Sequence, residues 1–239
     1  MTSVLMIMTA ADHWTLNDGT KHPTGFWAEE FVVPYRKFVD AGWDVTIATP
    51  GGVAPTVDEA SLGMAAGLPG TGKKMKAALD ELAPVLGSPR VLADVVSEIK
   101  SGAASYDLVF YPGGHGPMED LAADSDSGEL LRMRMDAGQP LALLCHAPAV
   151  IRAATGDDGA SPFAGRRMTG FSNAEERLNR LADKAPWLLE DELVRLGVDY
   201  DKALVPLASN VVVDGNLYTG QNPKSSEKLA ERVIGDLSK

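Results

Sequence analysis

The amino-acid sequence predicts an α/β fold of the flavodoxin-like type, a three-layer sandwich with a mostly parallel central sheet and a small insertion. Short continuous apolar runs, such as residues 4–8 and 141–144, have the composition of strands buried on both faces. Helical segments alternate with these runs, which is typical of parallel sheets covered by helices. The chain of 239 residues is long enough for a sizeable core. We therefore expect one domain over residues 1–239, with an insertion at about 51–87.

The first part of the chain is expected to fold as strand, helix, strand. The apolar run 4–8 is the first strand, residues 24–41 form a helix that Gly42 closes, and residues 43–49 form the second strand. The insertion is rich in glycine, proline and alanine, and we expect one short helix in it, around residues 73–83.

The remaining elements continue the alternation. Ser88 and Pro89 predict a helix start, with serine as the N-cap and proline in the first turn. Asp214 and Gly215 predict the turn of a hairpin. The expected elements are a helix over 88–99, strands over 106–111 and 141–144, helices over 129–137, 147–154, from 173 and over 187–196, a hairpin over 211–219 and a helix over 225–237.

Composition excludes several classes of protein. The net charge of -11 argues against a broad surface for nucleic acid or anionic membrane, since neither attracts an acidic protein. No apolar run approaches the roughly 20 residues that a membrane-spanning helix needs. The chain has a single cysteine, so an internal disulfide is impossible, and this fits a reducing cytoplasm. We expect a cytoplasmic protein that binds neither nucleic acid nor membrane.

The single cysteine, Cys145, directly follows the apolar strand 141–144 and precedes a helical segment. A strand-to-helix turn of this kind exposes a nucleophile at the top of a sheet, and it predicts a positive φ for Cys145. The amino end of the next helix is expected to face the thiol and to favour the thiolate. The alternative is a buried core thiol, because free cysteine is among the most buried residue types.

A glycine-rich loop ends the neighbouring strand, with Gly113 and Gly114 at its centre. Glycines allow the backbone to approach a ligand closely and to direct N–H groups at it. We interpret the loop as an oxyanion hole, with the N–H groups of Gly114 and His146 as donors. The alternative is an ordinary tight turn. For His115 alone, a structural role is the expectation.

Several short motifs occur in a specific order along nearly the whole chain. They are Asp18-Gly19, Thr24-Gly25-Phe26-Trp27-Ala28-Glu29-Glu30, Pro34-Tyr35, Gly113-Gly114-His115-Gly116, Cys145-His146, Met168-Thr169-Gly170-Phe171-Ser172 followed by Glu175-Glu176, and Thr219-Gly220-Gln221-Asn222-Pro223. Together they resemble the ThiJ/PfpI superfamily, whose fold is similar to that of class I glutamine amidotransferases. In particular they resemble the branch of the 31-kDa heat-shock chaperones and glutathione-independent glyoxalases.

The resemblance implies that a glutamate four residues before a proline on the first helix hydrogen-bonds the cysteine, which here is Glu30 before Pro34. A proline inside a helix cannot donate to the carbonyl four residues back, so the helix is expected to be distorted near Glu30. The alternative is that Glu29 and Glu30 are surface acids in a first helical turn.

The resemblance also implies a Cys-His-acid triad of Cys145, His146 and an acid that falls on Glu176, with Glu175 as the alternative. Without the family, Glu175 and Glu176 belong to an ordinary solvated helix face. The chain departs from many relatives by having Ala147 where they have glycine. This departure could change the room above the thiol.

The implied activity is that of a cofactor-independent glyoxalase, an enzyme acting on a small dicarbonyl. Cys145 would attack the aldehyde of methylglyoxal or glyoxal to give a hemithioacetal, and Glu30 or His146 would move a proton from C1 to C2. Hydrolysis would then yield lactate or glycolate, with oxyanions held by the loop of Gly113 and Gly114. A homodimer is expected, since relatives are commonly dimers.

Other functions are weighed against this one. Relatives include holding chaperones and protein deglycases, and the insertion at 51–87 could supply the apolar patch that a chaperone needs. An amidotransferase needs a histidine far downstream of the cysteine, but none follows His146. A metal could bind His13, His22 and nearby Asp12 or Asp18, but their spacing matches no common ligand pattern, so we expect no metal.

Overall fold

The central sheet of the computed structural model has seven strands, and the structure describes residues 1–63, 67, 69–156 and 158–238. All neighbouring strands are parallel except the last pair in chain order, which forms a hairpin. Across the sheet the strands are β10 (Val211–Asp214), β11 (Leu217–Gly220), β7 (Leu141–Leu144), β6 (Leu108–Tyr111), β1 (Ser3–Ile7), β4 (Asp44–Thr49) and β5 (Arg90–Val91). The predicted α/β fold with a mostly parallel sheet is confirmed.

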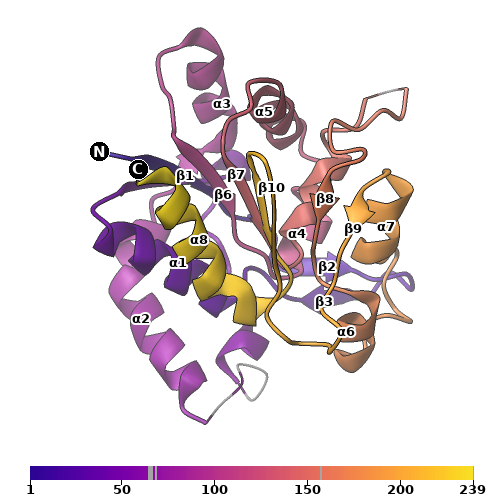
Figure 1. The fold of residues 1–239 in the computed structure, drawn as a ribbon. Helices are drawn as coiled ribbons and strands as arrows, with labels where there is room; N and C mark the ends of the chain where they lie inside the picture. The colour runs from indigo at the N-terminus through magenta and orange to yellow at the C-terminus, as the bar shows by residue number, and fades with distance from the viewer. Residues whose placement is uncertain (64–66, 68, 157, 239) are drawn as a thin grey trace.

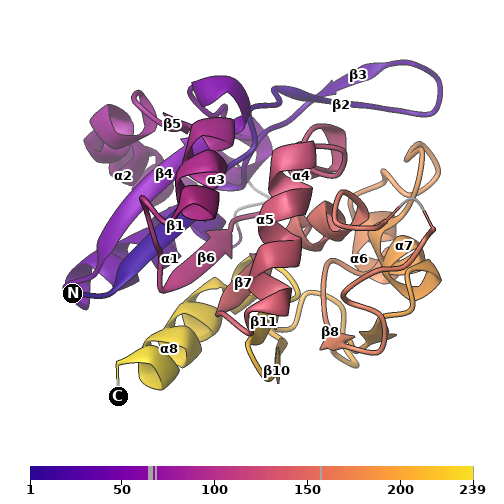
Figure 2. The ribbon, with the colours of Figure 1, turned by 90° about the horizontal axis from the view of Figure 1, so that it is seen from above.

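Helices cover both faces of this sheet (Figures 1 and 2). One face carries α1 (Ala28–Asp40), α2 (Thr71–Leu86) and α8 (Ser226–Leu237), and the other carries α3 (Leu92–Ser101) and α5 (Ser125–Asp136). The central strands β1, β6 and β7 are therefore enclosed on both sides, and nearly all their side chains are buried. This burial explains why the sequence of each is a continuous apolar run without polar alternation.

Smaller elements gather beyond the carboxyl ends of the central strands (Figure 1). They are the hairpin β2 (His13–Thr15) and β3 (Lys21–Pro23), the strand pair β8 (Arg167–Met168) and β9 (Asp199–Tyr200), the helices α4 (Gly116–Glu119), α6 (Asn173–Leu178) and α7 (Leu189–Arg195), and the 3-10 helices η4 (Ala147–Arg152) and η5 (Pro223–Ser225). Because ligands of parallel α/β sheets bind at this end, these elements form the walls of the candidate site.

The helix expected over residues 24–41 begins only at Ala28. The Phe26 N–H donates to the Thr56 carbonyl at 2.9 Å, and Phe26 forms an isolated bridge with Val57. This pairing with a distant segment keeps the backbone extended before the helix. Pro34 lies inside α1, as its sequence position predicts.

The helix start predicted at Ser88 is wrong. Arg90 and Val91 extend instead as β5 and pair with β4 at the edge of the sheet, so that α3 begins at Leu92. A long-range strand pairing here overrides a local capping signal.

The helix expected over residues 147–154 is a 3-10 helix, η4, of six residues. Two predicted helices are longer than expected: α5 begins four residues before residue 129, because Asp124 caps it, and α2 exceeds the range 73–83 at both ends. The hairpin of β10 and β11 is confirmed, with Asp214 paired to Leu217 across the turn.

The segment between β4 and β5 contains η1 (Pro50–Gly52), η2 (Glu59–Leu62) and α2, and α2 packs against α1. Residues 64–66 and 68 of the expected insertion lie outside the described residues. No helix in the described ranges is both long and apolar enough to cross a membrane.

Two helical glycines allow a test of this packing. A Cβ atom on Gly128 of α5 would lie 2.0 Å from the Ala153 carbonyl oxygen, whereas one on Gly235 of α8 would meet nothing within 4 Å. We expect Gly128→Ala to lower the free energy of unfolding by about 1–3 kcal/mol. The matched change Gly235→Ala should raise it by about 0.5 kcal/mol through helix propensity. Urea unfolding measures both, and equal stability of Gly128→Ala and the wild type would contradict the packing.

Candidate active site

Cys145 lies on a tight turn directly after β7, and its backbone is held from two sides. Its N–H donates to the Gly220 carbonyl at 2.8 Å, and its own carbonyl accepts from the Phe171 N–H at 2.9 Å. The φ angle of Cys145 is 60°, so the positive φ predicted from the sequence is confirmed. A non-glycine residue in this region stores strain, and such positions cluster at functional sites.

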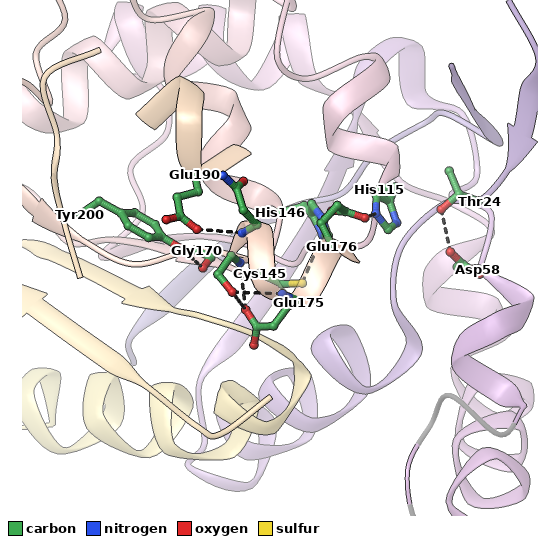
Figure 3. Close-up of polar contacts among 12 residues, drawn as sticks. Thr24, Asp58, His115, Cys145, His146, Gly170, Glu175, Glu176, Glu190 and Tyr200 are labelled. Carbon is green, nitrogen blue, oxygen red and sulfur yellow. Dashed lines mark hydrogen bonds and ion pairs between the residues drawn. The ribbon is translucent and has the colours of Figure 1, made fainter. Parts of the chain in front are cut away.

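The segment that supports this turn, at Gly170 and Phe171, is itself fixed by a hydrogen bond. Tyr200 of β9 donates its hydroxyl hydrogen to the Gly170 carbonyl at 2.7 Å (Figure 3). Gly170 is next to Phe171, so β9 indirectly fixes the residue that binds the Cys145 carbonyl.

His146 bridges the thiol and a carboxylate. Its Nδ1 lies 3.3 Å from the Cys145 Sγ, and its Nε2 lies 2.7 Å from Oε2 of Glu176 in the first turn of α6 (Figure 3). All three side chains are buried. Although burial opposes ionisation, His115 and His146 hold the pKa of the Glu176 carboxyl well below its ordinary value. Glu176 is therefore an anion that must accept a hydrogen, which assigns the proton of His146 to Nε2.

The remaining nitrogen of His146 is then free to accept a proton from the thiol. Burial, together with the charge of His115, lowers the pKa of the His146 imidazole below its ordinary value. A neutral imidazole with its Nδ1 lone pair directed at a thiol is a competent general base. The arrangement can therefore generate the thiolate at the moment of attack.

Glu30 projects from α1 into the same site and is fully buried. Its Oε2 accepts the Gly113 N–H at 2.9 Å, while Oε1 has no hydrogen-bond partner among the described residues. Burial raises the pKa of the Glu30 carboxyl well above its ordinary value, and hydrogen bonds with Cys145 and Gly113 offset this only in part. Burial thus favours the protonated form of the Glu30 carboxyl.

The expectation that the resting thiol ionises easily is wrong. Burial raises the pKa of the Cys145 thiol well above its ordinary value, and the adjacent Glu30 carboxyl group adds to the rise. The segment that follows, η4, is a single short 3-10 helix, so it lacks the aligned peptide dipoles on which the expectation relied. A base beside the sulfur is therefore required, and His146 occupies that position.

Of the two glycines predicted to bind an oxyanion, Gly113 is not available for this role. The Gly113 N–H is already donated to Glu30, so it is not free to bind an oxyanion. A Cβ atom on Gly113 would lie 2.5 Å from the Leu144 carbonyl oxygen, so only glycine fits between the two strand ends. The Gly114 N–H, in contrast, hydrogen-bonds the thiol and favours its ionised form.

Glu175 takes no part in the triad. It forms a capping box with Ser172, and its oxygens also accept hydrogens from the Leu207 N–H and from the side-chain amides of Gln221 and Asn222. The structure therefore places Glu176 beside His146 and uses Glu175 to join α6 to two distant loops. Sequence reasoning left this choice open because both acids lie in one helical turn.

His115 is the residue whose position the sequence did not predict. Its Nε2 lies 3.0 Å from Oε1 of Glu176, and its ring centroid lies 4.1 Å from that of His146. The sequence did contain a signal for this position: His115 lies in the loop after β6, just as Cys145 lies on the turn after β7. Both residues come from adjacent parallel strands and therefore meet at one edge of the sheet.

The two histidines considered for a metal in the sequence do not converge. In the hairpin, Trp14 is paired with His22 and His13 with Pro23, so the side chains of His13 and His22 point to opposite faces. His115, His146 and Glu176 do bring three possible ligand atoms within 4.8 Å of one another. Their N···O distances of 2.7 and 3.0 Å are those of hydrogen bonds, and we describe them as a hydrogen-bonded network.

A pocket of about 380 Å³ opens above the sulfur. Trp27, Phe171, Leu178 and Leu207 form its apolar walls. The polar and glycine lining consists of Glu29, Gly67, Gly114, His115, Cys145, His146, Asn179, Asn222 and Lys224, with Pro223 beside them. The thiol is therefore at the base of a pocket that a small molecule can enter, although only 3% of Cys145 is exposed.

Known proteins share this architecture. A model of the DJ-1/PfpI family matches residues 23–235. The protein/nucleic acid deglycase HchA of Staphylococcus aureus (strain JH9) is 26% identical over 247 residues, covering 98% of this chain and 79% of the relative. Rapid Encystment Protein 24 kDa of Francisella tularensis is 28% identical, with a TM-score of 0.82 over 99% of both chains. Glyoxalase III from Candida albicans is 24% identical, with a TM-score of 0.79 over 98% of this chain and 96% of its own.

The protonation of Glu30 can be measured directly. At pH 7 we expect difference infrared spectra to show the carbonyl stretch of a protonated carboxylic acid, because burial raises the Glu30 pKa. The band should disappear in Glu30→Gln and persist in Glu29→Gln, its less buried neighbour. A protonated-acid carbonyl band that is the same in Glu30→Gln and the wild type would show that Glu30 is ionised at this pH.

Proposed function

The chain belongs to the DJ-1/PfpI family, and we propose that it is a cofactor-independent glyoxalase that converts methylglyoxal, or glyoxal, and water to lactate, or glycolate. One observation carries the proposal: Cys145, His146 and Glu176 form a continuous buried chain, with distances of 3.3 and 2.7 Å, beside the buried carboxyl of Glu30, whose pKa is raised. A nucleophile, a base and a separate acid are the groups that an internal oxidation–reduction of a dicarbonyl requires.

The first step is addition. The Cys145 thiol passes its proton to His146 Nδ1 as the sulfur bonds to the aldehyde carbon, C1, of methylglyoxal. The electron pair of the C1 carbonyl bond moves to oxygen, and this oxygen takes the proton of Glu30. The Gly114 N–H, which hydrogen-bonds the thiol, lies where it can donate to the oxygen during attack. The product is a neutral hemithioacetal, with Glu30 now a carboxylate.

The second step moves hydrogen from C1 to C2. The Glu30 carboxylate removes the C1 hydrogen as a proton, and the electron pair left behind forms the C1–C2 double bond of an enediol, whose new hydroxyl takes the proton held by His146. Return of the proton from Glu30 to C2, with loss of the C1 hydroxyl proton to His146, gives a thioester. C1 is thereby oxidised and C2 reduced, so no external electron acceptor is needed.

The last step is hydrolysis. Water attacks the thioester carbon and gives a proton to Glu30, and the departing sulfur of Cys145 recovers its proton from His146. The second hydrogen of the water stays on the new carboxyl group, so the product leaves as lactic acid, which ionises to lactate in solution, and the site returns to its starting protonation. We also propose, from the single cysteine and the likeness to dimeric relatives, that the protein works as a cytoplasmic homodimer.

A protein deglycase is the second candidate, and the size of the pocket favours it. A volume of about 380 Å³ exceeds the needs of a three-carbon dicarbonyl, and the exposed side chains of Leu178 and Leu207 extend the apolar wall outward. A methylglyoxal adduct on a protein side chain would fit such an open site. Release of unmodified peptide from a methylglyoxal-modified peptide, faster than its spontaneous decay and dependent on Cys145, would favour this activity.

A holding chaperone would need exposed apolar surface. Of the described residues between 51 and 87, Val53 is the large hydrophobic side chain that is clearly exposed, whereas Leu204, Val205 and Leu207 are exposed together in the loop before β10. The patch expected in the insertion is therefore better sought in that loop. Suppression of aggregation that persists in Cys145→Ala, without turnover, would favour the chaperone.

The proposed reaction is tested by incubating the protein with methylglyoxal in the absence of glutathione and measuring lactate. We expect lactate to form, and Cys145→Ala to abolish it, because no other described side chain in the pocket is a thiol. Glu176→Gln should lower kcat/KM about 10²- to 10⁴-fold, since His146 loses the anion that orients it. The control Glu190→Gln changes a carboxylate that binds the N–H of Asn173 and not His146. Lactate formation that survives in Cys145→Ala would refute the reaction.

The pH dependence of the reaction follows from the same two groups. Because His146 must be neutral and its pKa is lowered, kcat/KM should rise on the acid side below the ordinary histidine value of about 6.5. Because Glu30 must carry its proton and its pKa is raised, activity should fall only at higher pH, as Glu30 ionises. A kcat/KM profile whose acid limb lies above pH ~6.5 would contradict this assignment of the base.

A further inference from the structure

We propose that His115 is a positioning residue that carries the proton balancing the Glu176 carboxylate, so that His146 stays neutral and is free to act as the base. The inference rests on the proposed function only in that it makes His146 the base of that reaction. It concerns a residue outside the Cys-His-Glu triad. It assigns to that residue the positive charge of the hydrogen-bonded network of His115, His146 and Glu176.

The first argument is that one carboxylate serves two histidines. Oε2 of Glu176 lies 2.7 Å from His146 Nε2, and Oε1 lies 3.0 Å from His115 Nε2. Both nitrogens must carry hydrogens to bind an anion, so each ring already has one proton at Nε2. A further proton can go only to Nδ1 of one ring, and on His146 this atom faces the thiol from which it must receive a proton.

The second argument is the environment of the His115 ring. Trp14 of the β2–β3 hairpin stacks on it, with a centroid distance of 5.1 Å and an interplanar angle of 21°. The indole face attracts a cation above it, and tryptophan is the strongest of the aromatic side chains in this respect. His146 instead lies against Phe171 in a tilted arrangement, with a centroid distance of 4.4 Å and an interplanar angle of 33°, and phenylalanine is a weaker partner for a cation. The aromatic surroundings therefore favour the proton on His115.

The third argument is electrostatic. The ring centroids of His115 and His146 are 4.1 Å apart in a buried site, so the two rings do not both carry a positive charge. Burial opposes the charge on His115, but Glu176 outweighs it and raises the His115 pKa above its ordinary value. Burial and the neighbouring His115 lower the His146 pKa. The groups that face the two rings are Glu176, Glu175, Cys145, Asp58, His22 and, beyond the thiol, Glu30.

The two histidines therefore have different roles in the network. A charged His115 neutralises Glu176, so Glu176 can orient His146 without holding a proton on it. Without that charge, the anion would act on His146 alone and would raise its affinity for a proton. The base would then be blocked at a pH at which the wild-type enzyme is active.

The order of protonation is measured by NMR titration of the intact protein with isotope-labelled histidine. The chain has four histidines, and contacts with the Trp14 and Phe171 rings distinguish His115 from His146. In the wild type we expect His115 to titrate at a higher pH than His146. The reverse order would overturn the proposal without the need for any variant.

The variant His115→Gln places an uncharged N–H donor within reach of Glu176. We expect the pKa of His146 to rise by about one unit or more, and the acid limb of kcat/KM for methylglyoxal to move to higher pH by the same amount. The matched variant His13→Gln changes a histidine that pairs with Asp12 and Glu119 outside the network, and it should leave both quantities unchanged.

The outcomes separate this inference from the proposed function. A folded His115→Gln protein with an unchanged His146 pKa, or with activity reduced equally at every pH, would show that His115 is merely structural. A raised His146 pKa in a protein that makes no lactate would refute the glyoxalase and leave the charge assignment of His115 standing.

Discussion

The hydrogen bond of 2.7 Å between His146 Nε2 and Glu176 is the interaction on which the site depends. It fixes the tautomer of His146 and thereby aims the lone pair of Nδ1 at the Cys145 sulfur, 3.3 Å away. The bond is possible because α6 begins at Ser172, where the capping box with Glu175 sets the first turn and brings Glu176 over the end of the sheet. A helix cap distant from the thiol in sequence therefore determines the protonation of the base beside it.

Two buried carboxyl groups flank the thiol, and their environments separate their pKa values. Glu176 faces two imidazoles, which lower its pKa, whereas Glu30 lies beside the glycine loop and the thiol, where burial raises its pKa and one of its oxygens has no partner among the described residues. Such a separation within one site assigns one group to orienting and the other to proton transfer. Burial favours the protonated form of Glu30, and it also makes a neighbouring base necessary, since it disfavours the thiolate of Cys145.

Much of this arrangement could be predicted from the sequence. The apolar runs predicted β1, β6 and β7, and the position of Cys145 after β7 predicted its positive φ. What failed depended on contacts between distant segments. The backbone pairing of Phe26 with Thr56 and Val57 delayed α1, and pairing with β4 turned Arg90 and Val91 into a strand.

The roles of single site residues were harder to predict for the same reason. The Gly113 N–H is taken by Glu30, which is 83 positions away in the chain, and His115 shares a carboxylate that is 61 positions away. No local pattern reveals either contact. The pKa of Cys145 was also predicted in the wrong direction, because the burial of the thiol and the approach of Glu30 from α1 both depend on contacts between distant segments.

The most direct test of the account is to locate the hydrogens of the resting site by neutron diffraction of crystals grown near neutral pH. The account predicts hydrogen on Nε2 of His146, none on its Nδ1, and hydrogens on the Cys145 sulfur and on one oxygen of Glu30. Hydrogen on Nδ1 of His146 facing a bare sulfur would show a preformed ion pair, and it would contradict the neutral base on which the account rests.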